Sequence, residues 1–311
     1  MTEPAASEGR AAKCSRCGFV ALIGAPNSGK STLTNTLVGA KVAIVTHKAQ
    51  TTRGPVLGIA LHGKSQIILV DTPGVFQPKL RLDRAMSGAA WTHAAEADLV
   101  TLVIDAERGI DAALDPVFAN LSYVKRPIIA VLNKIDLVAK PELLHLTSEL
   151  SKRHAFERTF MISALTDDGV PDFKSYLADG VPPGPWLYPK DQLTDAPLRQ
   201  AAAEITREKL FFRLHDELPY SLTVETTDWT ELKDGSVRID QTIYVMRDSQ
   251  KKIVLGAKGA TIKEISMAAR KNIGEMIDAP VHLFLFVKVR ERWSEDPERY
   301  REMGLGYPKD G

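Results

Sequence analysis

The sequence predicts an α/β fold in which a doubly wound, mostly parallel sheet is followed by a smaller α+β domain. Three features indicate this: continuous apolar runs that alternate with helical stretches, a glycine-rich loop directly after the first run, and a proline-rich segment after residue 180. Unbroken apolar runs are typical of strands buried on both faces, and helices between them are typical of parallel sheets. We therefore expect ligands at the carboxyl ends of these strands.

Length and composition agree with a globular protein of two domains. The chain has 311 residues, with 40 Lys and Arg against 39 Asp and Glu, so a net charge of +1 gives no global sign of a nucleic-acid partner. The two cysteines, Cys14 and Cys17, cannot form a disulfide framework and indicate a reducing compartment, so we expect a cytoplasmic protein. No apolar run reaches the length of a membrane span, and residues 1–17 lack the apolar centre of a signal peptide.

The larger domain follows from five apolar runs, at residues 19–23, 67–70, 99–104, 128–132 and 160–162. Residues 32–38 and 141–154 have helical character between them. Residues 56–61, a short polar turn and the run 67–70 are typical of a hairpin, which would place one antiparallel strand at the edge of the sheet.

Five prolines within residues 181–197 rule out a helix or a central strand there. We therefore predict a flexible arm over residues 1–17, a first domain over 18–180, a linker over 181–197 and a second domain over 198–311. Within the second domain the pattern predicts helices over 198–218 and 260–272, and strands over 222–226, 237–246 and 281–289.

The loop after the first apolar run, residues 24–31, matches G-x-x-x-x-G-K-[ST] and leads into a helix, which is the context of a phosphate-binding loop. Backbone N–H groups surround the phosphates, Lys30 neutralises them, and the Ser31 hydroxyl is a ligand for Mg²⁺. The motif alone does not separate ATP from GTP. The residues that we expect to bind nucleotide here are Asn27, Ser28, Gly29, Lys30, Ser31 and Thr32.

Two later strand ends supply the rest of the expected site. Asp71, after the run 67–70, can hold Mg²⁺ through water, and the Gly74 N–H can meet the γ-phosphate. After the run 128–132, the Asp136 carboxylate can accept hydrogen bonds from the N1–H and amine of guanine, which adenine does not offer, so the nucleotide is GTP. We also expect Asn133 to tie this loop to the phosphate loop, Lys134 to lie along the base, and backbone N–H groups of Ser163, Ala164 and Leu165 to approach guanine O6.

These motifs, in this order and each at a strand end, resemble the GTPase domain of the TRAFAC class over residues 18–180. Pro26-Asn27 and Gln50-Thr51-Thr52-Arg53 further resemble its TrmE–Era–EngA group. The resemblance implies a Ras-like fold and Mg²⁺-dependent hydrolysis of GTP to GDP and phosphate, with Lys30, Thr52, Asp71 and Gly74 as the catalytic residues. Thr52 would be the switch threonine that reaches Mg²⁺ and the γ-phosphate, with Thr51 the weaker candidate.

Val75 follows Gly74, where Ras-like enzymes carry the glutamine that orients the attacking water. Hydrolysis must therefore be assisted differently. The resemblance implies that Asn27 holds a K⁺ ion, which would supply positive charge to the transition state.

In the second domain a short motif, Gly256-Ala257-Lys258-Gly259, opens the predicted helix 260–272, whose apolar Ile262, Ile265, Ala269 and Ile273 share one face. Glu264 is the one acid between Lys251 and Lys271, so positive charge is concentrated here. The pattern is typical of a KH module that binds single-stranded RNA, with a solvated basic helix face as the alternative. The expected RNA-binding residues are Gly256, Ala257, Lys258, Gly259, Lys252, Lys263 and Lys271.

A KH-like domain after such a GTPase domain is the arrangement of the Era family, which residues 18–307 resemble. The resemblance implies a type II KH fold and a GTPase that binds the 3′ end of 16S ribosomal RNA and assists maturation of the small (30S) ribosomal subunit. It also implies a monomer in the cytoplasm with peripheral contact to the inner membrane. Two alternatives stay open: a GTPase of the same group that acts on another RNA or ribosomal particle, and an RNA scaffold that uses nucleotide only structurally.

Overall fold

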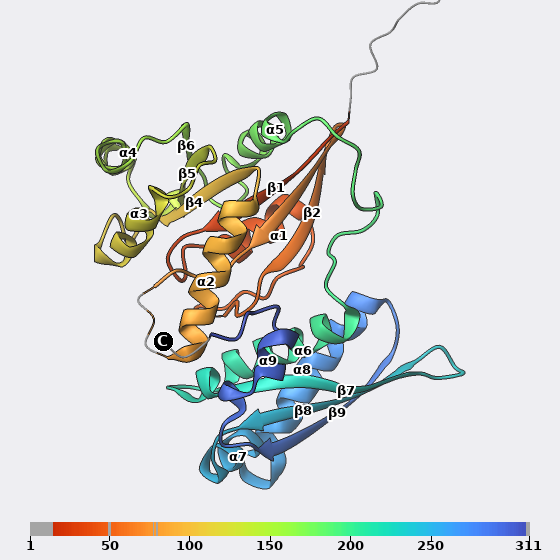
Figure 1. Cartoon of the computed structure of the whole chain (residues 1–311). Coiled ribbons are helices and arrows are strands. Elements are labelled where there is room, and N and C mark those ends of the chain that lie inside the picture. Colours follow the sequence, from red (N-terminus) through yellow and green to blue (C-terminus); the bar gives the residue numbers. More distant parts are fainter. Residues whose placement is uncertain (1–14, 49–50, 77, 79, 309–311) are drawn as a thin grey trace, which may run out of the picture.

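The computed structural model describes residues 15–48, 51–76, 78 and 80–308, which form two layered units joined along one side (Figure 1). Most of the predicted arm over residues 1–17, including Cys14, lies outside the described residues. Within the described part of the chain, no helix is both long and apolar enough to cross a membrane.

The first unit is built on a six-stranded sheet in the order β2-β3-β1-β4-β5-β6. Strands β1, β3, β4, β5 and β6 are parallel to one another, whereas β2 runs antiparallel to β3 at the edge, so both the parallel sheet and the edge hairpin are confirmed. The strands are β1 (Arg16–Ile23), β2 (Val56–His62), β3 (Ser65–Asp71), β4 (Leu99–Asp105), β5 (Ile128–Asn133) and β6 (Arg158–Met161).

Helices cover both faces of this sheet because successive apolar residues of each strand point to opposite sides. Val20 and Leu22 pack toward α1 (Lys30–Val38) and α5 (Val170–Gly180). Ala21 and Ile23 pack toward the opposite layer, which confirms the doubly wound arrangement. That layer consists of α2 (Arg81–Glu96), α3 (Asp115–Leu121) and α4 (Lys140–Arg153).

The edges of this unit differ from the sequence prediction in two places. Strand β1 begins at Arg16 rather than at residue 19, because residues 16–18 pair with β3 and the Arg16 guanidinium donates to the Val181 carbonyl at 2.7 Å. Helix α2 was not predicted, since its sequence is rich in small and polar residues and its apolar face is narrow.

The segment 181–197, predicted as a linker, packs along the sheet edge. The Gln66 side chain on β3 donates to the Tyr188 carbonyl and accepts from the Leu187 amide, and Thr194 pairs with Gly58 of β2. Since the segment is bonded at several points, it fixes where the second unit begins.

The second unit has a three-stranded sheet in the order β7-β8-β9, with β7 antiparallel and β9 parallel to β8. Its elements follow one another as helix, two strands, two helices and a strand, the order of a type II KH domain, and the helices share one face of the sheet. They are α6 (Leu198–Arg213), β7 (Leu222–Glu231), β8 (Val237–Val245), α7 (Asp248–Leu255), α8 (Ala260–Ile277) and β9 (Val281–Val289).

Several boundaries in this unit differ from the prediction: β7 and α8 end at residues 231 and 277 instead of 226 and 272. Helix α6 ends at Arg213 instead of residue 218, because Leu214 adopts an extended backbone and buries its side chain in the core. The apolar residues before Gly256, for which no helix was predicted, belong to a short helix, α7, which buries Val254 in the core and packs Leu255 against it.

The chain ends in a tail that contains α9 (Pro297–Glu302) and lies between the units (Figure 1). Tyr300 and Leu305 pack against Ala85 and Met86 of α2. A Cβ on Gly54 would lie 1.9 Å from the Met303 carbonyl oxygen, so the tail also approaches the backbone directly after Arg53.

Candidate functional site

A pocket of about 600 Å³ opens at the carboxyl ends of β1, β3 and β5. The structure brings nearly all the expected nucleotide residues to it, while Ser28 and Asp71 are buried beneath its floor. Those lining it are Asn27, Gly29, Lys30, Ser31, Thr32, Thr52, Gly74, Asn133, Lys134, Asp136, Ser163, Ala164 and Leu165.

Lys30 lies in the centre of the phosphate loop and is 6% exposed. Its ammonium group donates to the carbonyls of Gly24 at 3.2 Å and Ala25 at 2.9 Å. Burial lowers the pKa of Lys30 to about 8, although the nearby Asp71 carboxylate acts in the opposite direction. A phosphate group in the pocket would therefore be met by a cation that is already desolvated.

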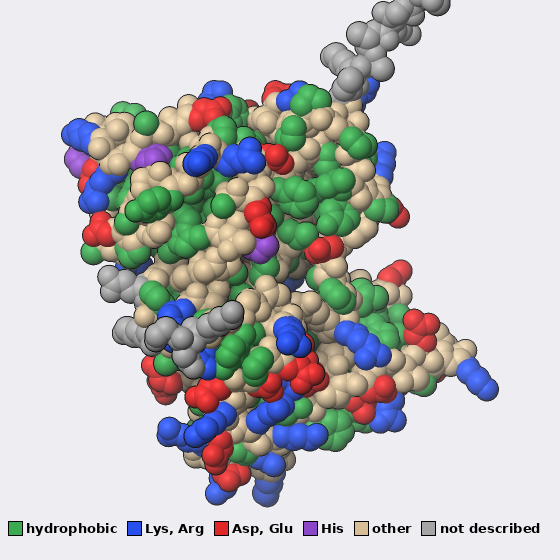
Figure 2. Space-filling model, viewed as in Figure 1, with side chains coloured by type: hydrophobic (Ala, Val, Ile, Leu, Met, Phe, Trp, Pro, Cys, Tyr) green, Lys and Arg blue, Asp and Glu red, His purple; other side chains and the backbone are tan. Residues whose placement is uncertain are grey.

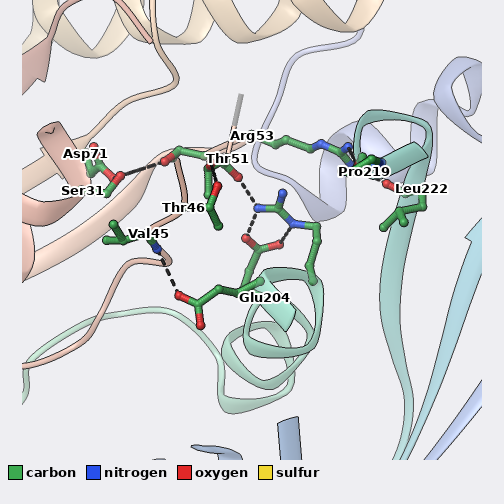
Figure 3. Close-up of polar contacts among 12 residues, drawn as sticks. Ser31, Val45, Thr46, Thr51, Arg53, Asp71, Glu204, Pro219 and Leu222 are labelled. Carbon is green, nitrogen blue, oxygen red and sulfur yellow. Dashed lines mark hydrogen bonds and ion pairs between the residues drawn. The ribbon is translucent and has the colours of Figure 1, made fainter. Parts of the chain in front are cut away.

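Ser31, Thr52 and Asp71 converge below the loop (Figure 3 shows Ser31 and Asp71). The Ser31 hydroxyl donates to Asp71 Oδ2 at 2.6 Å, and the Thr52 and Ser31 hydroxyl oxygens are 3.0 Å apart. Burial raises the pKa of Asp71 to about 6, against the hydrogen bond from Ser31 and the charge of Lys30. The second carboxylate oxygen, Asp71 Oδ1, is buried without a hydrogen-bond partner.

This set of hydroxyl and carboxylate oxygens fits Mg²⁺, which prefers oxygen ligands and completes its shell with phosphates and water. The described residues contain no group of three or more His, Cys, Asp or Glu side chains that could hold a metal.

Asn133 joins three of the predicted motifs. Its amide nitrogen donates to the Ser28 carbonyl, its amide oxygen accepts from the Ala164 backbone N–H, and both distances are 2.9 Å. A Cβ on Gly29, whose φ is 92°, would lie 2.1 Å from this amide, so glycine is required there. The predicted link between the base-side loop and the phosphate loop is thus present.

The base side of the pocket is more open. The Asp136 carboxylate is exposed at the wall, whereas Lys134 is held by an ion pair with Asp105 at the end of β4. Leu165 also lines the pocket, and its side chain is 81% exposed. Asp105 was not predicted as a site residue, although its position at the end of the run 99–104 could have indicated it.

Asn27 faces the segment that precedes Thr52. Its amide nitrogen donates to the His47 carbonyl at 3.1 Å, so a side-chain amide and a backbone carbonyl lie together at the pocket edge. His47 and Thr46, which also line the pocket, were not predicted. Gln50 of the same segment lies outside the described residues.

The loop between α7 and α8 has an unusual backbone. Gly256, Lys258 and Gly259 have φ angles of 73°, 51° and 78°. A Cβ on Gly256 would lie 2.2 Å from Thr261 Oγ1, so this glycine cannot be replaced without movement of the loop. Ala257 and the predicted basic residues Lys252, Lys258, Lys263 and Lys271 are all exposed. Figure 2 shows Lys and Arg side chains, interspersed with acidic ones, over the end of the unit that carries α7.

A groove of about 260 Å³ runs between α8 and β9. Of the predicted RNA-binding residues, only Lys263 lines it. Strand β9 is at the edge of its sheet, and its exposed Phe284 lies under the Arg238 guanidinium at 4.8 Å. The groove residues that were not predicted are Ile262, Ser266, Met267, Arg270, Leu283, Phe284 and Leu285.

Two matches to protein families cover the two units. Residues 19–134 match a family described as 50S ribosome-binding GTPase, and residues 217–294 match the KH domain. A GTPase Era from Rhizobium meliloti (strain 1021) is 59% identical over 309 residues, which are 99% of each chain. A GTPase Era from Bradyrhizobium diazoefficiens is 58% identical over 310 residues, covering 100% of each chain.

Solved structures give the same similarity. A crystal structure of Era in complex with MgGDPNP and nucleotides 1506–1542 of 16S ribosomal RNA is 36% identical, with a TM-score of 0.89 over 93% of this chain and 99% of that one. An Aquifex aeolicus Era variant bound to GDP and AlF4⁻ has the same identity and coverage, with a TM-score of 0.88.

Proposed function

The chain belongs to the Era family of GTPases, and from this premise we propose that it is a GTP-dependent switch that binds the 3′ end of 16S ribosomal RNA and assists maturation of the 30S subunit. One observation carries the proposal. The segment that brings Thr52 to Ser31 and Asp71 is bonded directly to the KH domain, since the Arg53 guanidinium donates to the Leu222 carbonyl at 2.7 Å. A change in the nucleotide therefore acts on an element that the RNA-binding domain also holds.

In this proposal the phosphates of GTP or GDP lie on the loop of Asn27 to Thr32, with Lys30 against the β- and γ-phosphates and the Gly74 N–H at the γ-phosphate. Guanine lies between Lys134 and the loop of Ser163, Ala164 and Leu165, with Asp136 at its N1–H and amine. Mg²⁺ is held by Ser31 and Thr52, and by Asp71 through water. When bound, this ion supplies positive charge where the transferred phosphoryl group develops negative charge.

Val75 cannot orient a water molecule, because its side chain is apolar and 2% exposed. We propose that Asn27 and the His47 carbonyl together hold K⁺: the Asn27 amide nitrogen lies 3.1 Å from this carbonyl at the pocket edge, so rotation of the amide would bring its oxygen beside the carbonyl oxygen as a second ligand. Replacing K⁺ by Na⁺ at constant ionic strength should slow GTP turnover in the protein and leave an Asn27→Ala variant insensitive to the exchange. Equal turnover of the protein in both salts would contradict the K⁺ site.

RNA would follow the loop of Gly256, Ala257, Lys258 and Gly259 and enter the groove between α8 and β9. The glycines let the sugar-phosphate backbone approach the start of α8, and Lys252, Lys258, Lys263 and Lys271 neutralise phosphates. Inside the groove, Met267 and Phe284 offer apolar surface to bases, and the edge of β9 offers backbone donors and acceptors.

Fluorescence anisotropy tests this function. A labelled oligonucleotide that copies the 3′ end of 16S ribosomal RNA should bind more tightly to the protein with a non-hydrolysable GTP analogue than with GDP, and more tightly than a scrambled oligonucleotide. A Lys258→Glu variant should lose RNA affinity and keep its affinity for GTP. Equal binding of both oligonucleotides in both nucleotide states would contradict the proposal.

The second candidate is a GTPase of the same group that acts on another ribosomal particle. The match of residues 19–134 to a 50S ribosome-binding family favours it. Co-sedimentation with purified 30S and 50S subunits separates the candidates, since the proposed function requires GTP-dependent binding to 30S.

A further inference from the structure

The segment before β2 rests on the first helix of the KH domain at several successive points. Glu208 of α6 accepts from the Val45 backbone N–H at 3.2 Å and pairs with the Lys41 ammonium at 2.7 Å. The Lys48 ammonium donates to two backbone carbonyls near the end of α6, that of Phe211 and that of Leu214 directly after the helix. Thr51 and Arg53, the residues on either side of Thr52, also contact the KH domain.

Arg207 makes the contact nearest to the nucleotide site. Its side chain is buried on α6 and its Nη2 donates to the Thr51 carbonyl oxygen. Figure 3 labels Thr51 and Glu204, two of its partners. The same guanidinium bonds Glu204, at 2.8 Å from Nε, and lies over the Phe211 ring at 5.2 Å. Its Nη1 is buried without a hydrogen-bond partner. The Thr51 carbonyl is therefore the contact through which this cation reaches the GTPase domain.

Arg53 anchors the other side of Thr52. Besides Leu222, its guanidinium donates to the Tyr220 carbonyl at 3.0 Å and lies over the Trp293 ring at 5.3 Å. Thr52 is thus placed between two residues whose positions are set by the KH domain, while its own hydroxyl lies 3.0 Å from that of Ser31.

We propose that Arg207 is a positioning residue for GTP hydrolysis: by holding the Thr51 carbonyl, it keeps the Thr52 hydroxyl at Ser31 and Asp71. This inference rests on the proposed role of Thr52 as a Mg²⁺ ligand. It assigns a helix of the RNA-binding domain a direct part in assembling the GTPase site.

Arg207→Met can test this role, because the charges around Arg207 allow its guanidinium to be removed. Burial and the neighbouring charge of Arg207 lower the pKa of Arg53 to about 9, with Glu204 acting in the opposite direction. Arg207→Met removes one of these two like charges and keeps an unbranched apolar stem beside Phe211. Glu204 is 35% exposed and can turn to water when its partner is lost. We therefore expect this variant to fold.

Two readouts test the inference. Arg207→Met should lower kcat about tenfold and raise the Mg²⁺ concentration needed for half-maximal hydrolysis by a similar factor, as is typical when a group supporting a metal ligand is removed. Independently of activity, hydrogen exchange of peptides containing Thr51 to Arg53 should be faster in the GTP-analogue complex. GDP affinity in EDTA should stay unchanged, because Lys30 and Asp136 are untouched.

Two comparison variants sharpen the result. Arg207→Lys should restore part of the activity, because an ammonium can donate to the Thr51 carbonyl but cannot also form the fork with Glu204. Arg213→Ala is the matched control: it lies on the same helix, and its ion pair with Glu264 at 2.9 Å is exposed and within the KH domain. It should leave hydrolysis and exchange unchanged.

A normal Mg²⁺ dependence together with normal exchange in Arg207→Met would overturn the inference. So would a parallel fall of melting temperature and GDP affinity in EDTA, which would show a purely structural role. Thr52→Ala separates this failure from failure of the proposed function. If Thr52→Ala alters Mg²⁺ dependence and Arg207→Met does not, only the positioning role is wrong; if neither does, the role of Thr52 is wrong.

Discussion

The nucleotide pocket and the RNA groove are built in opposite ways. At the phosphate end of the pocket, buried polar side chains bond the backbone of loops that are distant in sequence, as Asn133 bonds the Ser28 carbonyl and the Ala164 N–H. At the groove, the exposed cations Lys263 and Arg270 lie beside an apolar surface, and Lys252 on α7 and Lys258 in the loop after it are also exposed. We therefore expect single substitutions to have large, specific effects in the pocket and small, graded effects at the groove.

Asp71→Asn should have the largest effect. Since Asp71 supplies a carboxylate beside Ser31 at the expected Mg²⁺ site, its loss should slow Mg²⁺-dependent GTP hydrolysis about 100-fold or more. Single-turnover hydrolysis measures this directly. If Asp71→Asn lowers the hydrolysis rate by a smaller factor than a groove variant lowers RNA affinity, the contrast between the two regions is wrong.

The same variant should stabilise the protein without nucleotide. Burial raises the pKa of Asp71 to about 6, so its contribution to stability is present below the unfolded pKa and is lost as pH rises through about 6. Asp71→Asn should therefore melt at a higher temperature than the unsubstituted protein at pH 8, and this advantage should shrink as pH falls toward 4. With Mg²⁺ and GDP present the order should reverse, because only the carboxylate gains from the bound ion. Melting curves across pH in both conditions are the check.

Gly256→Ala should have an intermediate effect. The backbone there, with φ of 73° and ψ of 175°, strongly favours glycine, and the added methyl would meet Thr261. RNA affinity should fall about tenfold, which corresponds to about 1.4 kcal/mol. Gly184→Ala is the control, because a Cβ at that position meets nothing within 4 Å. Unchanged RNA binding in Gly256→Ala would place the RNA elsewhere.

Lys252→Ala should have the smallest effect. Loss of one phosphate contact should weaken RNA binding a few-fold and reduce the slope of log affinity against log salt by about 0.7. Lys233→Ala, in the exposed turn between β7 and β8, should change neither quantity. A loss of more than tenfold for Lys252→Ala would mean that this lysine makes a buried, specific contact.

Local patterns predicted the fold well where they are strong. The five apolar runs predicted β1 and β3 to β6, and the hairpin pattern predicted β2. The spacing of Ile265, Ala269 and Ile273 predicted the buried face of α8. Prediction failed where a tertiary contact overrides the local signal. Leu214 leaves the helical conformation to fill the KH core, and α2 is held in place by the tail as well as by its own sheet.

The functional residues also divide into those that a local motif predicts and those that depend on tertiary contacts. Lys30, Asp71 and Asn133 were predictable because each belongs to a short motif at the end of a strand, so sequence spacing sets their position. Arg53 and Arg207 carry no such motif. Arg53 meets Leu222 across 169 positions of sequence, and Arg207 meets Thr51 across 156. No local pattern encodes such contacts, and the groove residues Met267 and Phe284 likewise depend on how α8 lies beside β9.

The tail described above has a practical consequence for handling the protein. Tyr300 and Leu305 pack against α2, and Met303 meets Gly54 beside Arg53, so the tail touches both a helix of the GTPase domain and the segment that carries Thr52. A fluorescent reporter or a surface tether attached through the carboxyl end would pull on these elements, whereas Arg16, at the start of β1, lies at the opposite end of that strand from the nucleotide pocket. Labels and tethers intended to leave GTP turnover undisturbed therefore belong at the amino end.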